Sequence, residues 1–149
     1  MSATDHDLAL ELLSEFIGTG ISSIECDEFQ LKLRFEDKSV FTTESPWRLL
    51  LKGDLVVGSG DGKKGASEEV FQHLKGLKAN SVTISELGDT QLVFENDYVL
   101  DVILTSVRYE AWQANLLAGW VIFMGGHSIT VFPPADRLPD SDDSRSRIV

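Results

Sequence analysis

A glycine-rich segment is the first part of this sequence that could carry chemistry. Within Gly58–Gly65, three glycines follow the G-x-G-x-x-G spacing of dinucleotide-binding loops, after an apolar strand and before a predicted helix. Such a loop binds pyrophosphate where a parallel strand–helix–strand unit presents a helix N-terminus. Here the flanking patterns predict hairpins, and Glu68 and Glu69 would repel phosphate at the helix start. We interpret the segment as a linker, with a nucleotide-binding enzyme as the alternative.

Ser128 is the second candidate, because Gly126-His127-Ser128 resembles the first half of a nucleophile elbow. An elbow needs a strand that runs directly into a helix, so that the serine projects from a sharp turn. The residues after Ser128 are β-branched and aromatic, which predicts a strand instead. A serine in a hairpin is therefore the preferred interpretation, and a small hydrolase that uses Ser128 is an alternative.

The remaining reactive residue types form no recognisable group. The three histidines, His6, His73 and His127, are scattered, and no His or carboxylate spacing is typical of a metal site. Cys26 is the single cysteine, and the neighbouring Asp27 and Glu28 disfavour its thiolate. We therefore expect a non-enzymatic protein without catalytic residues, metal or cofactor.

The charge of the chain indicates the kind of partner. The net charge is −11 over 149 residues, which disfavours binding to nucleic acid or to anionic membranes. The same acidity would steer a basic protein towards this one. We expect protein-binding contacts at acidic turns and at tryptophans, which are favoured at interfaces. The predicted partner-binding residues are Asp27, Glu28, Glu95, Asp97, Trp47 and Trp112.

No targeting segment is predicted. The start carries acidic residues and no Lys or Arg, unlike a secretory signal. The most apolar run, Leu116–Gly126, is shorter than the roughly 20 residues that a membrane span needs. A cytoplasmic location is the expectation.

Hydrophobic periodicity predicts the elements. Leucines and Phe16 recur at helical intervals after Thr4, and the helix should stop at Gly18. Ser67 should cap a short helix that ends near Leu77. Alternating or apolar runs predict strands at Ile21–Ile24, Phe29–Glu36, Val40–Glu44, Trp47–Leu51, Leu55–Val57, Ser81–Glu86, Thr90–Glu95, Tyr98–Leu104, Val121–Met124 and Ser128–Phe132. The segment Arg108–Leu117 fits a helix as well as a strand.

These elements predict an α+β fold, mainly antiparallel β-sheet, with an N-terminal helix and one short connecting helix. The chain contains a weak internal repeat: Phe35-Glu36-Asp37 before Val40 resembles Phe94-Glu95-Asn96 before Val99. We therefore expect two meander-like halves. A chain of this size forms one domain. We place that domain at 1–134 and a disordered Asp- and Arg-rich tail at 135–149.

Two features resemble a known group of proteins: the segment Tyr109–Gln113 and the apolar hairpin around Gly125-Gly126. The chain from Gly18 to Phe132 is similar to small bacterial β-rich domains, some of which are immunity proteins encoded beside polymorphic toxins. The resemblance implies an inhibitor that binds a protein, with no catalytic residues to transfer. The expected partner is then a basic toxin. A structural homo-oligomer is a third interpretation of the sequence.

Overall fold

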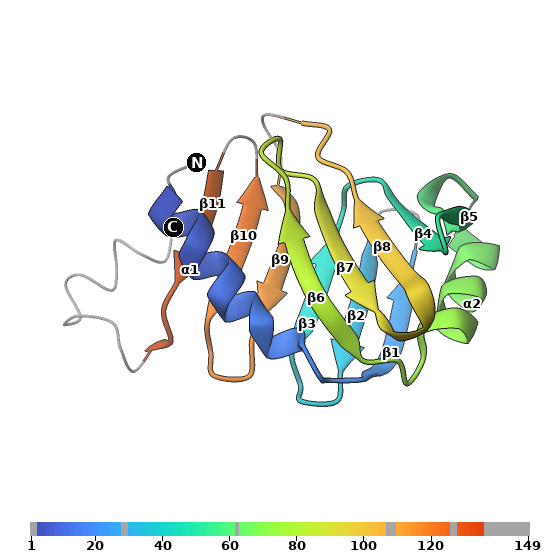
Figure 1. Ribbon diagram of the computed structural model, residues 1–149, viewed down its shortest axis with the longest axis horizontal. Coiled ribbons are helices and arrows are strands. Elements are labelled where there is room, and N and C mark those ends of the chain that lie inside the picture. Colours follow the sequence, from blue (N-terminus) through green and yellow to red (C-terminus); the bar gives the residue numbers. More distant parts are fainter. Residues whose placement is uncertain (1–2, 28–29, 62, 107–109, 126–127, 136–149) are drawn as a thin grey trace.

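The protein consists of two antiparallel sheets packed face to face (Figure 1). A computed structural model describes residues 3–27, 30–61, 63–106, 110–125 and 128–135. The six-stranded sheet contains, in spatial order, β1 (Ile21–Cys26), β2 (Leu31–Phe35), β3 (Val40–Thr43), β9 (Glu110–Asn115), β10 (Val121–Gly125) and β11 (Ser128–Phe132). The five-stranded sheet contains β5 (Asp54–Gly58), β4 (Trp47–Leu51), β8 (Tyr98–Val102), β7 (Thr90–Phe94) and β6 (Ala79–Ile84).

Period-two patterning assigns one face of each sheet to the core. In β2, Leu31, Leu33 and Phe35 are buried, while Lys32 and Arg34 point to the other face. In β7, Thr90, Leu92 and Phe94 are buried and Gln91 is exposed, so this strand alternates in the same way. The predicted α+β, mainly antiparallel fold is confirmed, because local alternation is enough to specify strands of this kind.

The two halves of the chain have the same pairing pattern. Ile21 of β1 pairs with Phe35 of β2, and Ala79 of β6 pairs with Phe94 of β7. Each pair is followed by a register shift, before Ser23 in one half and Ser81 in the other. The meanders β1-β2-β3 and β6-β7-β8 are therefore matching units, which confirms the two meander-like halves.

After each meander the chain crosses to the other sheet. β4 follows β3 in sequence but pairs with β8, so that Trp47 lies opposite Val102. β9 follows β8 but pairs with β3, so that Trp112 lies opposite Thr43. Each sheet thus combines a meander from one half of the chain with the next strands from the other half.

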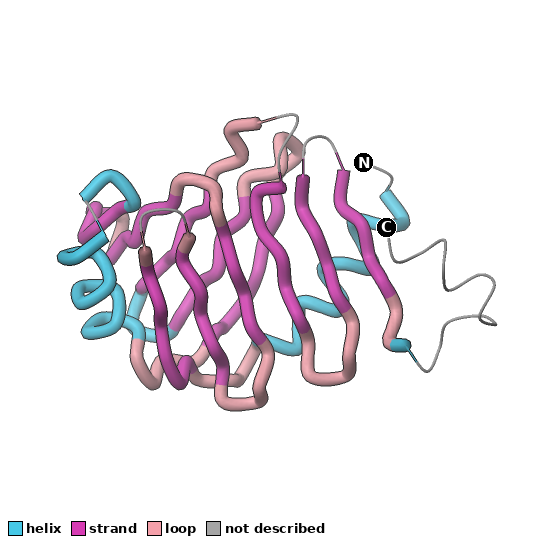
Figure 2. The backbone as a smooth tube through the Cα atoms, turned by 180° about the vertical axis from the view of Figure 1, so that it is seen from behind, coloured by secondary structure: helices cyan, strands magenta, loops and turns pink. Residues whose placement is uncertain are grey.

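Helices cover the margins of the two sheets (Figures 1 and 2). α1 (Ala3–Leu13) and the 3₁₀ turn η1 (Ser14–Phe16) run beside β6 and across β11. At the other margin, η2 (Ser59–Asp61) leads into α2 (Lys63–Leu74), which packs against β1 and β5. These contacts shield edge strands that would otherwise expose unpaired backbone groups. A third 3₁₀ turn, η3 (Glu95–Asp97), joins β7 to β8.

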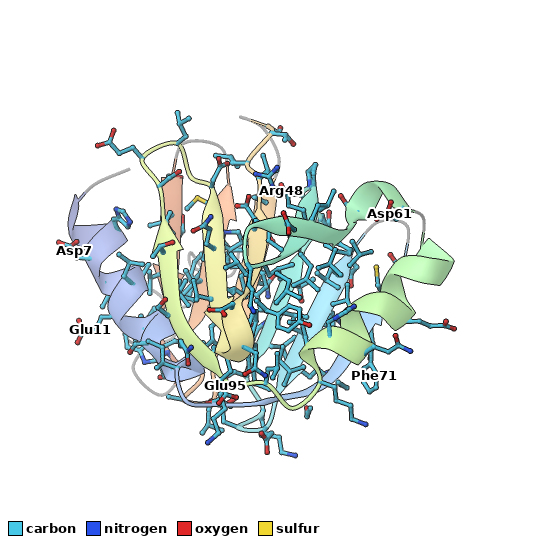
Figure 3. All side chains as sticks on the ribbon, turned by 45° about the vertical axis from the view of Figure 1, so that its right-hand side comes forward. Asp7, Glu11, Arg48, Asp61, Phe71 and Glu95 are labelled. Atoms are coloured by element: carbon cyan, nitrogen blue, oxygen red, sulfur yellow. The ribbon has the colours of Figure 1, made fainter. Side chains whose placement is uncertain are left out.

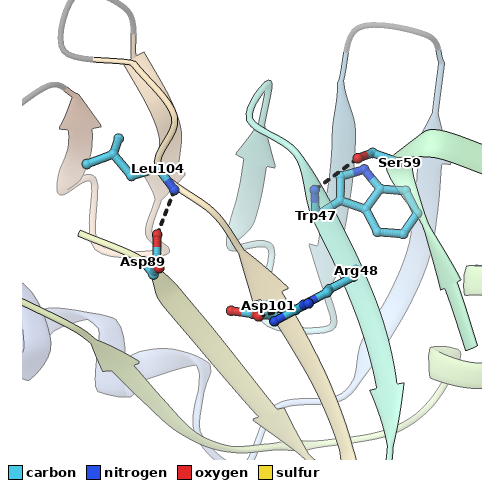
Figure 4. A network of polar contacts seen from close by, with 6 residues as sticks. All are labelled: Trp47, Arg48, Ser59, Asp89, Asp101 and Leu104. Atoms are coloured by element: carbon cyan, nitrogen blue, oxygen red, sulfur yellow. Dashed lines mark hydrogen bonds and ion pairs between the residues drawn. The ribbon is translucent and has the colours of Figure 1, made fainter. Parts of the chain in front are cut away.

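Polar side chains tie the strands together at defined points (Figure 4). The Arg48 Nε donates to the Asp101 carboxylate at 2.9 Å across β4 and β8, and Asp101 is only 6% exposed. The Asp89 carboxylate accepts the Leu104 N–H at 2.9 Å, which holds the chain beyond β8 against the turn between β6 and β7. The indole N–H of Trp112 donates to the Thr90 hydroxyl at 2.8 Å and so links the two sheets through the core.

Two predictions of local structure are settled or corrected by this fold. The ambiguous segment Arg108–Leu117 is a strand from Glu110 to Asn115, because it completes the pairing of β3 with β10. The connecting helix begins at Lys63 rather than near Ser67, and it includes Gly65. The predicted disordered tail at 135–149 falls on 136–149, which lie outside the described residues, apart from the exposed Ala135.

Candidate functional site

A groove of about 420 Å³ lies on the outer face of the six-stranded sheet. Figure 2 views this face, and no helix of the described chain crosses it. The groove, called the sheet groove below, is lined by β2, β3 and β9 and by the residues just outside those strands. Its lining residues are Gln30, Lys32, Arg34, Val40, Thr42, Glu44, Glu110, Ala111, Trp112, Gln113 and Asn115.

Strand register places the charges of the sheet groove at different points along it. Arg34 lies opposite Val40, and Lys32 lies opposite Thr42 one pleat further along. Glu44 and Glu110 lie beyond the paired ends of β3 and β9. The groove therefore has a cationic part along β2 and an acidic part at the far end of β3 and β9.

The acidic end of the sheet groove is electrostatically strained. Burial raises the pKa of Glu110, and the negative charge of Glu44 raises it further. At the cationic part, the Arg34 Nε donates to the Glu25 carboxylate at 3.5 Å, and both side chains are largely exposed. Such a long, exposed pair contributes little and leaves Arg34 free to exchange partners. Both parts of the groove are therefore able to bind groups of opposite charge.

The chemistry available in the sheet groove favours binding. The amides of Gln113 and Asn115 contact each other at 3.2 Å and offer further donors and acceptors between the charged parts. A carboxyl with a raised pKa is also what general acid catalysis uses, so Glu110 is the group to test for the enzyme alternative.

A second charged surface follows the exposed side of the first helix. Asp7 and Glu11 are exposed, Glu15 is half-buried, and the three recur at every fourth position of α1 and η1. Figure 3 shows Asp7 and Glu11 on the outer side of α1. Burial raises the pKa of Glu15, and the negative charge of Asp37 adds to that effect. We call Asp7, Glu11 and Glu15 the acidic stripe.

The predicted acidic contact residues lie in turns, where they bind backbone groups. The Asp27 carboxylate accepts the Gln30 N–H at 2.9 Å between β1 and β2. The Glu95 carboxylate accepts the Lys78 N–H at 2.8 Å, and Asp97 is exposed with a left-handed backbone, at φ 66°. Glu28 lies outside the described residues. The carboxylates of Asp27 and Glu95 therefore stabilise the turns in which they lie.

The same residues do not form one surface. Gly20, just before β1, bridges to Lys78 beside Glu95, whereas Asp27 follows the opposite end of β1. A single small contact with a partner cannot include both turns.

Trp47 and Trp112 need a correction as predicted contact residues. Trp47 is 5% exposed and Trp112 is 1% exposed, so both belong to the core between the sheets. Each stands at the start of a crossover, where a large apolar side chain fills the space between the two layers. The side chain of Trp47 is therefore closed off from a partner, and Trp112 borders the sheet groove with almost no exposed surface.

Two polar side chains near the start of the glycine-rich segment accept backbone N–H groups of the protein. The Asp61 carboxylate accepts the Gly58 N–H at 2.8 Å, and the Ser59 hydroxyl accepts the Trp47 N–H at 3.1 Å. β5, which precedes the segment, pairs with β4 in antiparallel fashion. This part of the chain therefore does not have the parallel strand–helix–strand context of a dinucleotide site.

Ser128 is the first residue of β11 and pairs with Gly125 across the final hairpin. It is exposed and leads into a strand, not into a helix. His127 beside it lies outside the described residues. The hairpin interpretation of Ser128 is therefore the one that matches the fold.

Cys26 lies in surroundings that disfavour its thiolate. Burial raises the pKa of its thiol, and the charge of Asp27 raises it further. Within the described ranges, no three His, Cys, Asp or Glu side chains gather closely enough to hold a metal ion. Among the helices that the structure describes, none has the length and apolar character needed to cross a membrane.

Sequence reasoning did not identify the sheet groove. The alternation of residues in β2 places Lys32 and Arg34 on one face, so the cationic part of the groove could be inferred from the sequence. The acidic part of the groove depends on the pairing of β9 with β3, which brings together residues that are far apart in the chain.

The comparisons with known proteins leave the resemblance to immunity-type domains as a prediction. No protein-family model, no curated protein and no solved structure matches this chain.

Proposed function

We propose that this protein is a non-catalytic module that binds a basic protein partner through the acidic stripe. The observation that carries the proposal is the unbalanced run of carboxylates at Asp7, Glu11 and Glu15. α1 contains no Lys or Arg, and no basic residue lies in its last turn. The stripe therefore presents negative charge without a compensating cation on the same helix.

The stripe is unfavourable for the helix that carries it. Like charges four residues apart repel each other, and negative charge near a helix C-terminus opposes the helix dipole. Burial raises the pKa of the half-buried Glu15, and the negative charge of Asp37, from the turn between β2 and β3, raises it further. A basic partner would relieve the repulsion on binding, so the same charges that cost stability supply affinity and speed of association.

A finer form of the proposal concerns the partner. The resemblance to immunity proteins suggests a basic, nuclease-like toxin, whose phosphate-binding surface would accept carboxylates in place of phosphates. In this form the protein is an immunity-type inhibitor. A captured partner that cuts nucleic acid, and that is inhibited by this protein, would support it.

The direct test is capture of partners from lysate of the native cell with matched variants. Asp7→Asn, Glu11→Gln and Glu15→Gln together neutralise the stripe. The control neutralises three exposed carboxylates elsewhere, Asp54→Asn, Glu68→Gln and Glu86→Gln, with the same change in net charge. We expect the control to retain a basic partner that the stripe variant loses.

Association kinetics then separate charge steering from other contacts. With the captured partner, the association rate should fall steeply as salt rises, because exposed charges are screened over roughly 8 Å at physiological salt. An acidic partner, a rate that is independent of salt, or equal capture by both variants would each contradict the proposal.

A further inference from the structure

The shape of the sheet groove follows from the side chains that three neighbouring strands present on one face. β3 lies in the middle and contributes the short side chains of Val40 and Thr42. Longer side chains stand opposite these two residues on either side: Lys32 and Arg34 of β2, and Gln113 and Asn115 of β9. The groove therefore runs along β3, with β2 and β9 as its walls.

The groove has the length of a short extended segment of polypeptide. From Val40 to Glu44 it covers about 13 Å, because each residue of a strand adds about 3.3 Å. An extended segment that lies along β3 advances by the same distance per residue, so two of its side chains that are four residues apart reach the two ends of the groove. The volume of about 420 Å³ is within the range of ligand-binding pockets.

The two ends of the groove differ in charge. At the Val40 end, β2 presents the guanidinium of Arg34, whose ion pair with Glu25 is long, at 3.5 Å, and exposed. At the other end, Glu44 and Glu110 lie close enough for the charge of Glu44 to raise the pKa of Glu110. A carboxylate at the first end and a guanidinium or ammonium group at the second would each gain a partner, and the cation would also relieve the repulsion between the two carboxylates.

Between its ends the groove offers hydrogen-bonding groups that suit a peptide backbone. The Gln113 Nε2 donates to the Asn115 Oδ1 at 3.2 Å. The Gln113 carbonyl oxygen is then an acceptor for a ligand, and the Asn115 amino group is a donor. An extended segment carries an N–H and a C=O at every residue, and these groups need such partners when they leave water. The middle of the groove therefore favours a polypeptide over an isolated ion.

We propose that the sheet groove binds an extended segment of a protein partner, with an Asp or Glu at the Arg34 end and an Arg or Lys four residues away, between Glu44 and Glu110. No residue of α1 or η1 lines the groove, so this surface is separate from the acidic stripe and the inference goes beyond the proposed function. Exposed ion pairs are individually weak, so the isolated segment binds weakly and adds to the affinity of other contacts in a complex.

Titration of the isotope-labelled, full-length protein with blocked peptides tests the spacing of the charges. The probe is acetyl-Thr-Glu-Ser-Thr-Ser-Arg-Thr-amide, in which Glu and Arg are four residues apart. The matched control, acetyl-Thr-Ser-Glu-Arg-Thr-Ser-Thr-amide, has the same composition, but its charges are adjacent and reach only one end of the groove. We expect the control to bind about fivefold more weakly, which corresponds to the loss of one exposed ion pair.

The positions of the shifted signals show where the probe binds. The amide signals of Thr42 and Gln113, which lie in the groove, should shift with the probe and reach saturation. Those of Thr83 and Gln91, at exposed positions of the other sheet, should stay unchanged. Equal affinity for the two peptides, shifts of the same size on both sheets, or no shift at the groove would overturn the proposal.

Variants at the acidic end show whether the pairing is the one proposed. Glu44→Gln with Glu110→Gln removes the charge of that end, and Asp54→Asn with Glu86→Gln makes the same change in net charge at exposed positions elsewhere. The first variant should bind the probe about fivefold more weakly, and the second should bind it like the unchanged protein. All three proteins should bind alike a peptide in which Gln replaces the Arg. The amide spectrum shows that each variant is folded, and full affinity of the first variant for the probe would contradict the assignment.

The dependence on protein concentration separates a partner from a second copy of the chain. Without peptide, the amide signals of Thr42 and Gln113 should keep their positions as the protein is concentrated, because the groove awaits a different protein. A change confined to the groove would show that another copy of the chain fills it, and the proposal of a segment from a different protein would fail.

Discussion

At the scale of single residues, one buried hydrogen bond connects the two sheets. The Trp112 indole comes from the six-stranded sheet and the Thr90 hydroxyl from the five-stranded sheet, and both side chains are almost fully buried. Trp112 also packs on Phe41, with ring centroids 5.3 Å apart. The polar contact fixes the orientation of a large side chain that apolar packing alone would leave less specific.

Thr90→Val should therefore lower the free energy of unfolding by about 1–3 kcal/mol, because the buried indole N–H loses its acceptor. Urea unfolding followed by circular dichroism measures the change. Thr83→Val, on an exposed position of β6, is the control and should change stability by less than about 0.5 kcal/mol. Equal effects of the two substitutions would show that the hydrogen bond is not important.

At the scale of elements, α1 and η1 combine a buried apolar side with an acidic exposed side. Ala9, Leu13 and Phe16 are fully buried, and Phe16 stacks on Phe35 at 4.6 Å between ring centroids. This packing holds the helix against the sheets despite the repulsion along the acidic stripe. Glu15 is affected by burial and by charge repulsion: its side chain is half-buried, and it lies close enough to Asp37 for that negative charge to raise its pKa further.

The pH dependence of stability follows from the raised pKa of Glu15. The folded state binds this proton more tightly than the unfolded state, so stability falls as pH rises from about 4.5 through the raised value. Glu15→Gln should increase the free energy of unfolding at neutral pH and give no such gain well below pH 4.5. Chemical denaturation across this range checks it, with Glu86→Gln in an exposed turn as the control. A gain of equal size at all pH values would contradict the electrostatic explanation.

At the scale of the whole molecule, the crossovers make the two halves of the chain depend on each other. β4 from the first half completes the sheet of the second meander, and β9 from the second half completes the sheet of the first. One continuous hydrophobic core lies between the sheets. Neither half has a complete sheet or a closed core of its own.

We therefore expect a single cooperative unfolding transition. Amide signals of Leu33 in the six-stranded sheet and Leu92 in the five-stranded sheet should disappear at the same urea concentration in a titration followed by NMR. Both leucines are fully buried and occupy matching positions in their meanders, so each serves as the control for the other. Two separate midpoints would show that the halves fold independently.

The sequence by itself determined the local elements and the sign of the surface charge. Alternation in Leu31–Phe35 and Thr90–Phe94 specifies strands because successive side chains point to opposite faces, and this depends only on neighbouring residues. The tertiary structure alone decided that β9 lies beside β3, which buries Trp112 and brings Glu110 into one groove with Lys32. Strand pairing between distant segments is decided by the packing of the whole core, and the local pattern of a strand does not encode its partner.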